Sequence, residues 1–285
     1  MATRKSSSRG RQASGTSRNS DSQKKAFSKS KSRFNKESRS RSSIQKKTTS
    51  DTIRLNKYIA NSGICSRREA DTYIKTGSAT VNGKVITEMG FQVNPGDEVR
   101  FEGSLINPEV KRYVLLNKPK NYLTNVDDER GRKTVMELIH GATKERIYPV
   151  GRLDRNTTGL LLFTNDGDLA KKLTQPKIPF KKLYQVSLDK KLAMKDLKKI
   201  EENVLIEGKM VFIDAISYIE NQPKTEVGIE IHSGRNRIVN KIFEHFGYKV
   251  TKLDRVLFAE LTKKNLPRGH WRHLTQQEVN NLKMI

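Results

Sequence analysis

The residues whose types and spacing suit chemistry lie in the stretch GRLDRNTTGLLLFTNDG, residues 151–167. One carboxylate, Asp154, stands there between Arg152 and Arg155. A carboxylate held in a loop can act as a nucleophile or as a general base. The two arginines either favour its ionised form or hold an anionic backbone while the carboxylate reaches a sugar or base. Taken alone, an Asp between arginines more often forms a loop salt bridge than a catalytic site.

The residues that follow Asp154 predict a rigid support for it. The apolar run 160–164 predicts a strand that passes through a core. Asn165-Asp166-Gly167 is a turn sequence, after which Asp168 is expected to cap a helix. Asp154 is therefore expected in a loop that a buried strand holds in place.

The region 112–285 predicts an α+β domain built on a largely antiparallel mixed sheet. Apolar and alternating patterns predict strands at 113–119, 160–164, 183–188, 211–219 and 225–233. One helix is expected to be capped by Asp196, and another to cover 236–246. Strands mixed with a few helices, without strict alternation, are typical of the α+β class.

Residues 52–111 predict a smaller unit with two helices and a small sheet. Ser66 and Glu69 form a capping-box pattern at the start of the second helix. Asn82-Gly83 predicts a tight hairpin turn. Four basic residues on the first helical turns are candidate contacts for a polyanion: Arg54, Lys57, Arg67 and Arg68.

The composition indicates a nucleic-acid-binding protein. The 285-residue chain has a net charge of +25 and only 34% hydrophobic residues. Residues 1–51 hold fifteen Lys and Arg and few apolar side chains, so we expect a disordered basic tail. This tail either binds phosphates without reading sequence or only solubilises the protein. A pI near 10.1 favours nucleic acid over an anionic membrane surface, because no basic amphipathic helix stands out.

Other protein classes fit the sequence poorly. No apolar run reaches the roughly 18 residues that a membrane span needs, and the N-terminus lacks the apolar core of a secretory signal. The single cysteine, Cys65, excludes an internal disulfide and a multi-cysteine zinc site and fits a reducing cytoplasm. His270 and His273 lack acidic or cysteine neighbours in the sequence, so we expect no metal site there. A cytoplasmic monomer is the expected state.

Two stretches of the chain resemble known families. The segment RLNKYIANSGICSRREADTYIKTGSATVNGKV, residues 54–85, resembles the S4-type RNA-binding domain. That resemblance implies that the basic helix face docks on folded RNA. The stretch around Asp154 is similar to the signature of the pseudouridine synthases that act on ribosomal RNA, in the branch with an added S4-type domain. Further motifs follow in the expected order: YVLLNKP (113–119), KKLYQV (181–186), HSGRNRIVNKIFEHFG (232–247), KLDRVLFAEL (252–261) and LPRGHWRHLT (266–275).

The resemblance implies isomerisation of uridine in ribosomal RNA, most readily that of the large subunit. The N-glycosidic bond breaks, the uracil turns, and its C5 bonds to the ribose, with no need of a cofactor or metal. The base must leave its stack to react, so flipping into a pocket is expected. Asp154 would be the essential carboxylate and Tyr184 would stack on the base. The implied RNA-facing residues around this site are Arg152, Arg155, Arg235, Arg237 and Lys241.

The third motif departs from the family pattern. GRNRQVRR is usual there, and its seventh position is an arginine that pairs with the catalytic carboxylate. Here Ile238 replaces the glutamine and Asn240 replaces that arginine. A neutral amide cannot replace a guanidinium fork. Lys241 lies one residue further, about 100° round a helix, so it is not expected to substitute.

Two other functions compete with the isomerase. The first is a catalytically weakened RNA-binding factor that acts in ribosome assembly, with assembly intermediates as partners, as the loss of the arginine at Asn240 suggests. The second is a hydrolase, which the sequence disfavours. A two-metal nuclease needs clustered carboxylates, and a glycosidase needs an acid pair that flanks the bond, whereas a predicted strand separates Asp154 from Asp166.

Overall fold

The computed structural model of the protein describes residues 52–175, 180–235 and 237–285. The predicted basic tail, residues 1–51, lies outside them. The helices are α1 (Leu55–Asn61), α2 (Arg67–Lys75), α3 (Val135–Leu138), α4 (Gly167–Thr174), α5 (Met194–Glu201), α6 (Ile238–His245) and α7 (Gln276–Met284). The shorter strands of the N-terminal part are β1 (Ile53–Arg54), β2 (Ala79–Val81), β3 (Lys84–Val85), β4 (Gln92–Val93), β5 (Val99–Phe101) and β6 (Ser104–Leu105). The remaining strands are β7 (Tyr113–Lys118), β8 (Tyr148–Pro149), β9 (Thr158–Thr164), β10 (Lys182–Leu188), β11 (Val204–Ile206), β12 (Lys209–Val211), β13 (Ala215–Tyr218), β14 (Glu226–Ile231), β15 (Val250–Phe258), β16 (Leu261–Thr262) and β17 (Trp271–His273).

Local sequence signals shape the part of the chain around α1 and α2. Ser66 caps α2, because its hydroxyl accepts from the Glu69 amide while the Glu69 carboxylate accepts from the Ser66 amide at 2.6 Å. The capping box is therefore confirmed. Asn82 and Gly83 both have positive φ, 50° and 77°, in the turn between β2 and β3, which confirms the hairpin. The buried core here includes Leu55, Ile59, Ala70, Ile74 and Val99.

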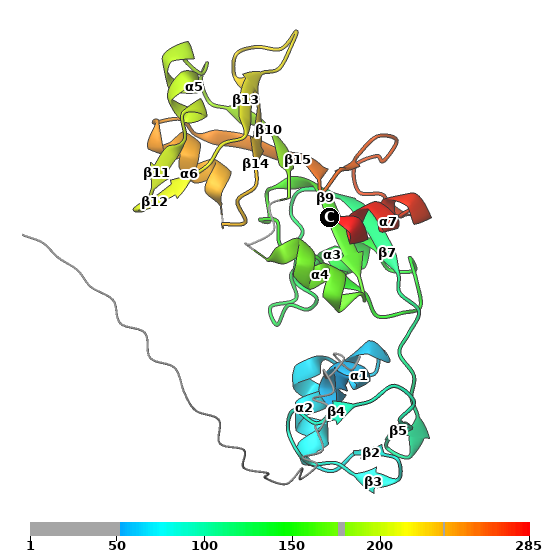
Figure 1. The fold of residues 1–285 in the computed structure, drawn as a ribbon. Coiled ribbons are helices and arrows are strands. Elements are labelled where there is room, and N and C mark those ends of the chain that lie inside the picture. The colour runs from blue at the N-terminus through cyan, green and yellow to red at the C-terminus, as the bar shows by residue number, and fades with distance from the viewer. Residues whose placement is uncertain (1–51, 176–179, 236) are drawn as a thin grey trace, which may run out of the picture. The chain divides into compact units, whose positions relative to one another are not determined.

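One mixed nine-stranded sheet organises the rest (Figure 1). Its main path runs β13-β14-β10-β15-β9-β7-β17, with β16 beside β15 and β8 beside β9. Every pair is antiparallel except β15 and β9. The predicted α+β class with a largely antiparallel mixed sheet is confirmed.

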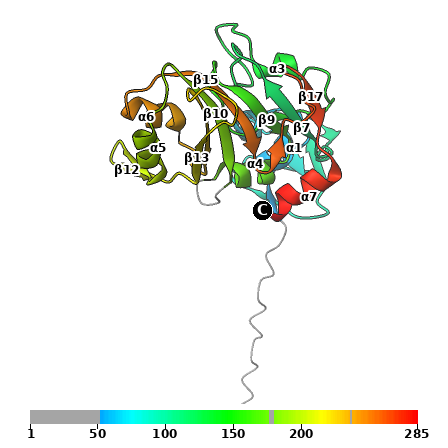
Figure 2. The ribbon, with the colours of Figure 1, turned by 90° about the horizontal axis from the view of Figure 1, so that it is seen from above.

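The sheet consists of two halves that meet at a narrow parallel seam. Helices α5 and α6 lie beside the half formed by β10, β13, β14 and β15 (Figure 2), where their apolar faces share one core with these strands. Strands β7 and β9 are buried by α3, α4 and α7, with Leu160 to Phe163 fully buried. Only Thr158 and Gly159 of β9 pair with β15, opposite Asp254 and Arg255.

Gly159 is what lets the two halves approach so closely. Its φ is +105°, and a Cβ atom there would lie 2.2 Å from the backbone oxygen of Arg255. A side chain is excluded both by this conformation and by this close approach. The seam thus holds the loop before β9, which carries Asp154, next to the half that carries Tyr184.

Three local predictions are wrong. Asp166, not Asp168, caps α4, because its carboxylate accepts from the Leu169 amide and Asp168 lies in the first turn. Helix α5 begins after Ala193, so Asp196 lies inside its first turn, where it accepts from the Tyr248 hydroxyl at 2.7 Å. The expected strand 211–219 is broken, since β12 ends at Val211 and β13 starts only at Ala215.

Candidate active site

The loop that carries Asp154 is fixed from below by a buried lysine. Lys118 ends β7 and is fully buried. Its ammonium donates to the backbone oxygens of Asp154 (3.1 Å), Arg155 (3.2 Å) and Thr157 (2.9 Å). The loop therefore has a set conformation although the side chains of Asp154 and Arg155 are exposed.

Burial controls the charge state of this lysine. The pKa of Lys118 is lowered from 10.5 to about 8, chiefly by burial; the charge of Asp154 opposes this shift and that of Arg268 adds to it. No carboxylate of the described residues forms an ion pair with it. The sequence analysis missed this residue. The available signal was a lysine two residues after the apolar run 113–116, and strand ends commonly carry such residues.

The Asp154 carboxylate faces a distant arginine rather than its neighbours. Its side chain is half exposed, and its Oδ2 lies 4.0 Å from Nε of Arg237. Arg237 precedes α6 with a left-handed backbone (φ 51°) and also lies 3.6 Å from Glu244. Arg152 and Arg155 are exposed and form no ion pair within the described part of the chain. A salt bridge with the flanking arginines is therefore not observed.

Helix α6 contains the two residues that depart from the third motif of the family, Ile238 and Asn240. Ile238 is buried in the core. The Asn240 Oδ1 atom is buried and has no hydrogen-bond partner among the described residues. Lys241 points elsewhere, since its ammonium lies 2.5 Å from Glu207 on the turn between β11 and β12. The expectation that Lys241 does not replace an arginine at 240 agrees with this ion pair.

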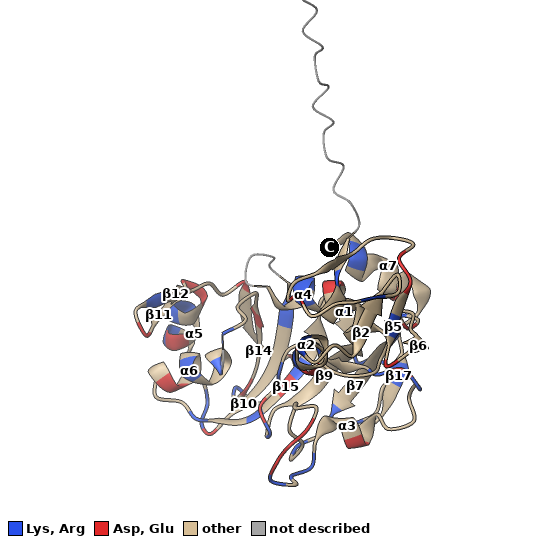
Figure 3. Cartoon of the chain, turned by 90° about the horizontal axis from the view of Figure 1, so that it is seen from below, with Lys and Arg blue, Asp and Glu red and all other residues tan. Residues whose placement is uncertain are grey.

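The Arg235 side chain contacts the same turn and not Asp154. It donates to the Ile206 oxygen at 3.2 Å and lies 4.0 Å from Glu207. Lys and Arg alternate with Asp and Glu over α5, α6 and this turn (Figure 3), so the surface here is mixed in charge.

Tyr184 lies on β10, directly opposite Arg255 of β15. The buried Arg255 guanidinium donates to the Leu160 oxygen at 2.5 and 2.8 Å and stacks on the Phe258 ring at 4.4 Å. Burial lowers the pKa of Arg255, and the neighbouring Tyr184 opposes that shift. Arg255 thus lies opposite the half-buried Tyr184 and is bonded across the seam to β9, a role that sequence reasoning missed.

A second buried lysine anchors the loop that carries Arg235 and Arg237. Lys182 Nζ donates to the oxygens of His232 (3.3 Å) and Ser233 (3.0 Å). Burial lowers its pKa to about 8, and the charge of Arg255 adds to the effect. Lys182 is two residues before Tyr184, so the alternation of a strand puts both side chains on one face.

The predicted RNA contacts around α1 and α2 are not gathered with Asp154. Arg54, Arg67 and Arg68 are exposed at the starts of the two helices. Lys57 forms an ion pair with Asp168 at 2.6 Å. No group of three His, Cys, Asp or Glu side chains suited to a metal occurs in the ranges that the structure covers. In those ranges no helix is long and apolar enough to cross a membrane.

Comparisons with known proteins identify the family of the chain. Residues 112–245 match the family model described as RNA pseudouridylate synthase, and residues 53–99 match the S4 domain. An uncharacterized RNA pseudouridine synthase of Aquifex aeolicus is 38% identical over 81% of this chain and 93% of the relative. Ribosomal large subunit pseudouridine synthase B of Bacillus subtilis is 40% identical over 81% of this chain and 96% of the relative. The dual-specificity RNA pseudouridine synthase RluF of Escherichia coli K12 is 37% identical over 81% of this chain and 78% of the relative.

A solved structure supports the same assignment. The crystal structure of a pseudouridylate synthase superposes with a TM-score of 0.57 at 28% identity, over 81% of this chain and 99% of that one. Both resemblances found in the sequence are confirmed, and the chain belongs to the RNA pseudouridine synthases, with an S4 domain ahead of the catalytic fold.

Proposed function

We propose that this chain converts uridine to pseudouridine at a specific position of ribosomal RNA, with Asp154 as the essential carboxylate. The observation that carries the proposal is the fixed, half-exposed Asp154 in a family whose relatives are named for this reaction. The large subunit is the favoured source of the RNA, because the Bacillus subtilis relative is named for it.

The reaction rearranges one nucleotide without adding or removing atoms. The bond from uracil N1 to the ribose C1′ breaks, a bond from C5 to C1′ forms, C5 loses a proton and N1 gains one. An ionised Asp154 suits either a nucleophile at the sugar or base, or a base toward the ribose C2′ proton. Arg237, whose Nε lies 4.0 Å from Oδ2 of Asp154, is close enough to orient the carboxylate.

Tyr184 is proposed to stack on the flipped uracil. Its ring lies on the side of the sheet that packs on the core beside α6, and Arg255 stands opposite it on β15. A half-buried tyrosine ring offers a flat platform for a base at little entropic cost.

The proposed RNA contacts comprise two sets. In the catalytic part of the chain they are Arg152 and Arg155 beside Asp154, Arg237 facing it, and Arg235 and Lys241, which contact Glu207. Around α1 and α2 they are Arg54, Lys57, Arg67 and Arg68. We also propose a division into a basic tail (1–51), an RNA-binding domain (52–111) and a catalytic domain (112–285), acting as a monomer in the cytoplasm. Ribosome-assembly intermediates are the alternative form of the substrate.

One observation favours a second function, an RNA-binding assembly factor with little turnover. The Asn240 Oδ1 atom is buried without a partner among the described residues, so this position contributes no cation toward Asp154. Arg237 supplies one at 4.0 Å, which is why we favour the enzyme.

The test is to incubate the full chain with unmodified ribosomal RNA and to map pseudouridine by a chemical adduct that arrests reverse transcription. One discrete site, lost in Asp154→Asn while RNA binding survives, is the expected result. Activity that appears only in Asn240→Arg would establish the assembly factor instead. If neither the native chain nor any variant forms pseudouridine, on free RNA or on assembly intermediates, the proposed isomerase activity is overturned. Free uracil or cleaved RNA would indicate a hydrolase.

A further inference from the structure

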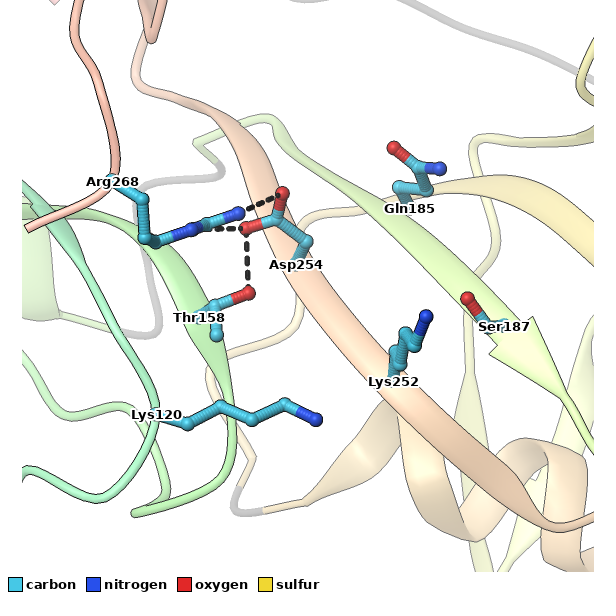
Figure 4. Close-up of a pocket in the computed structure, with 7 residues that line it drawn as sticks. All are labelled: Lys120, Thr158, Gln185, Ser187, Lys252, Asp254 and Arg268. Carbon is cyan, nitrogen blue, oxygen red and sulfur yellow. Dashed lines mark hydrogen bonds and ion pairs between the residues drawn. The ribbon is translucent and has the colours of Figure 1, made fainter.

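A hollow of about 340 Å³ lies over strands β9, β10 and β15, and its residues do not include Asp154 or Tyr184 (Figure 4). Three cationic side chains line it: Lys120 just after β7, Lys252 on β15 and Arg268 before β17. They come from three separate stretches of the chain and converge on one space. Its lining holds a single carboxylate, that of Asp254.

This carboxylate is fully engaged by its neighbours. Arg268 donates to both oxygens of Asp254 at 2.9 and 3.0 Å, Thr158 donates at 2.8 Å, and Lys263 also pairs with it. Burial raises the pKa of Asp254, but these hydrogen bonds outweigh burial and hold the pKa at about 2. Asp254 therefore fixes the Arg268 guanidinium in place and has little capacity left to neutralise other cations.

The two lysines of the hollow lack such partners. Among the residues that the structure describes, neither Lys120 nor Lys252 forms an ion pair. Two neutral side chains of the lining, Gln185 and Ser187, already donate hydrogen bonds within the protein. Both donate to Glu226, at 3.3 and 2.9 Å. Recognition in this space thus depends on cations, and the charge they offer is in excess.

The hollow lies on the opposite face of the sheet from the Tyr184 ring. Gln185 pairs with Asp254 and Ser187 with Lys252, so these four side chains share one face. Tyr184 pairs with Arg255, one residue out of phase with them, and therefore points to the other face. The hollow therefore lies on the other face from the Tyr184 ring, and neither Asp154 nor Tyr184 lines it.

We propose that this hollow binds a phosphate group, through Lys120, Lys252 and the fixed Arg268. The phosphodiester backbone of an RNA strand is one source of that group, and free phosphate is the other. If the phosphate belongs to RNA, the inference rests on the proposed function. The bound RNA strand would then run from the catalytic face of the sheet, past the seam, to the face that carries the hollow. Asp154 and Tyr184, the residues assigned to base chemistry, do not contact a phosphate bound in the hollow, because they do not line it.

The test compares Lys120→Gln/Lys252→Gln with a control of equal charge, Lys195→Gln/Lys198→Gln, which removes two exposed lysines of α5. Affinity of each full chain for unmodified ribosomal RNA is measured from low to high salt. The slope of log K against log salt should fall by about 0.7 to 0.9 for each phosphate that the variant no longer neutralises. In parallel, the Tm is measured with and without inorganic phosphate.

A flatter salt slope in the hollow variant than in the control identifies RNA backbone as the ligand. A phosphate-induced rise in Tm that is present in the native chain and the control but absent from the hollow variant identifies free phosphate. If the hollow variant matches the control in both measurements, the proposal is overturned. An equal Tm of both variants without phosphate shows that each is folded. Neither readout needs turnover, so failure of the isomerase would appear only in the mapping experiment.

Discussion

Replacing Lys118 by Met should remove a defined part of the pH dependence of stability. The substitution keeps an unbranched stem in the buried space and deletes the ammonium. The Lys118 pKa is 10.5 when the chain is unfolded and about 8 when it is folded. At pH 7 the lysine is protonated in both states, and the native state bears the cost of the buried charge. Between pH 8 and 10.5 the unfolded chain binds more protons, so stability rises with pH.

The size of the effect follows from the shift. A difference of roughly 2.5 pH units corresponds to about 3 kcal/mol over the full window. The slope inside the window is therefore about 1 kcal/mol per pH unit. The free energy of unfolding of the native chain should rise by about 1 kcal/mol more than that of Lys118→Met between about pH 8.5 and 9.5. Tyrosines begin to titrate near pH 10, which sets the upper end of the range.

Urea titrations of both proteins at half-unit steps of pH measure this difference. Lys198→Met, at an exposed lysine of α5, serves as the control and should keep the native slope. Stability at pH 7 alone does not discriminate, because four carbonyls lose their donor while a buried charge is relieved. Parallel curves for the native chain and Lys118→Met would refute the reasoning, since they would mean that Lys118 titrates alike in both states.

Three further substitutions probe the seam and the site. Gly159→Ala should lower the free energy of unfolding by at least about 3 kcal/mol, because it adds positive-φ strain to a clash with the Arg255 backbone; a loss below about 1 kcal/mol in denaturant titrations would contradict this. Arg237→Gln should lower kcat by no more than about fivefold, since an exposed ion pair contributes at most about 1 kcal/mol. A loss as large as that of Asp154→Asn, in single-turnover assays, would mean that Arg237 contacts the reacting nucleotide. Lys182→Met should loosen the loop at His232 and Ser233 and speed hydrogen exchange of the amides after it; unchanged exchange would show that the loop is held by other contacts.

Features fixed within a few residues were predictable from the sequence. Ser66 and Glu69 satisfy each other over three residues, so the capping box needed no tertiary information. Asp166 and Asp168 were ambiguous because both are good caps, and the choice depends on Tyr113, which donates to Asp166 at 2.8 Å from 53 positions away. The break between β12 and β13 contains no Gly or Pro from which it could have been predicted.

The parts of the candidate site that were missed all depend on long-range contacts. Lys118 reaches carbonyls 36 to 39 positions away, and a lysine at a strand end gives no sign of burial. The partner of Asp154 was sought among its neighbours and at 240, whereas the backbone conformation before α6 presents Arg237. Only the fold shows which cation of a basic motif faces a given carboxylate.

The seam between β9 and β15 also bears on the order of folding. Each half of the sheet packs mainly on a core of its own, and the strand ladder between the halves has just two residue pairs. Asp154 belongs to one half and Tyr184 to the other, so neither half alone contains the pair. A folding intermediate with only one half formed would lack one of the two residues. The strand after the Asp154 loop, β9, and the strand of Tyr184, β10, are joined only when β15 inserts between them.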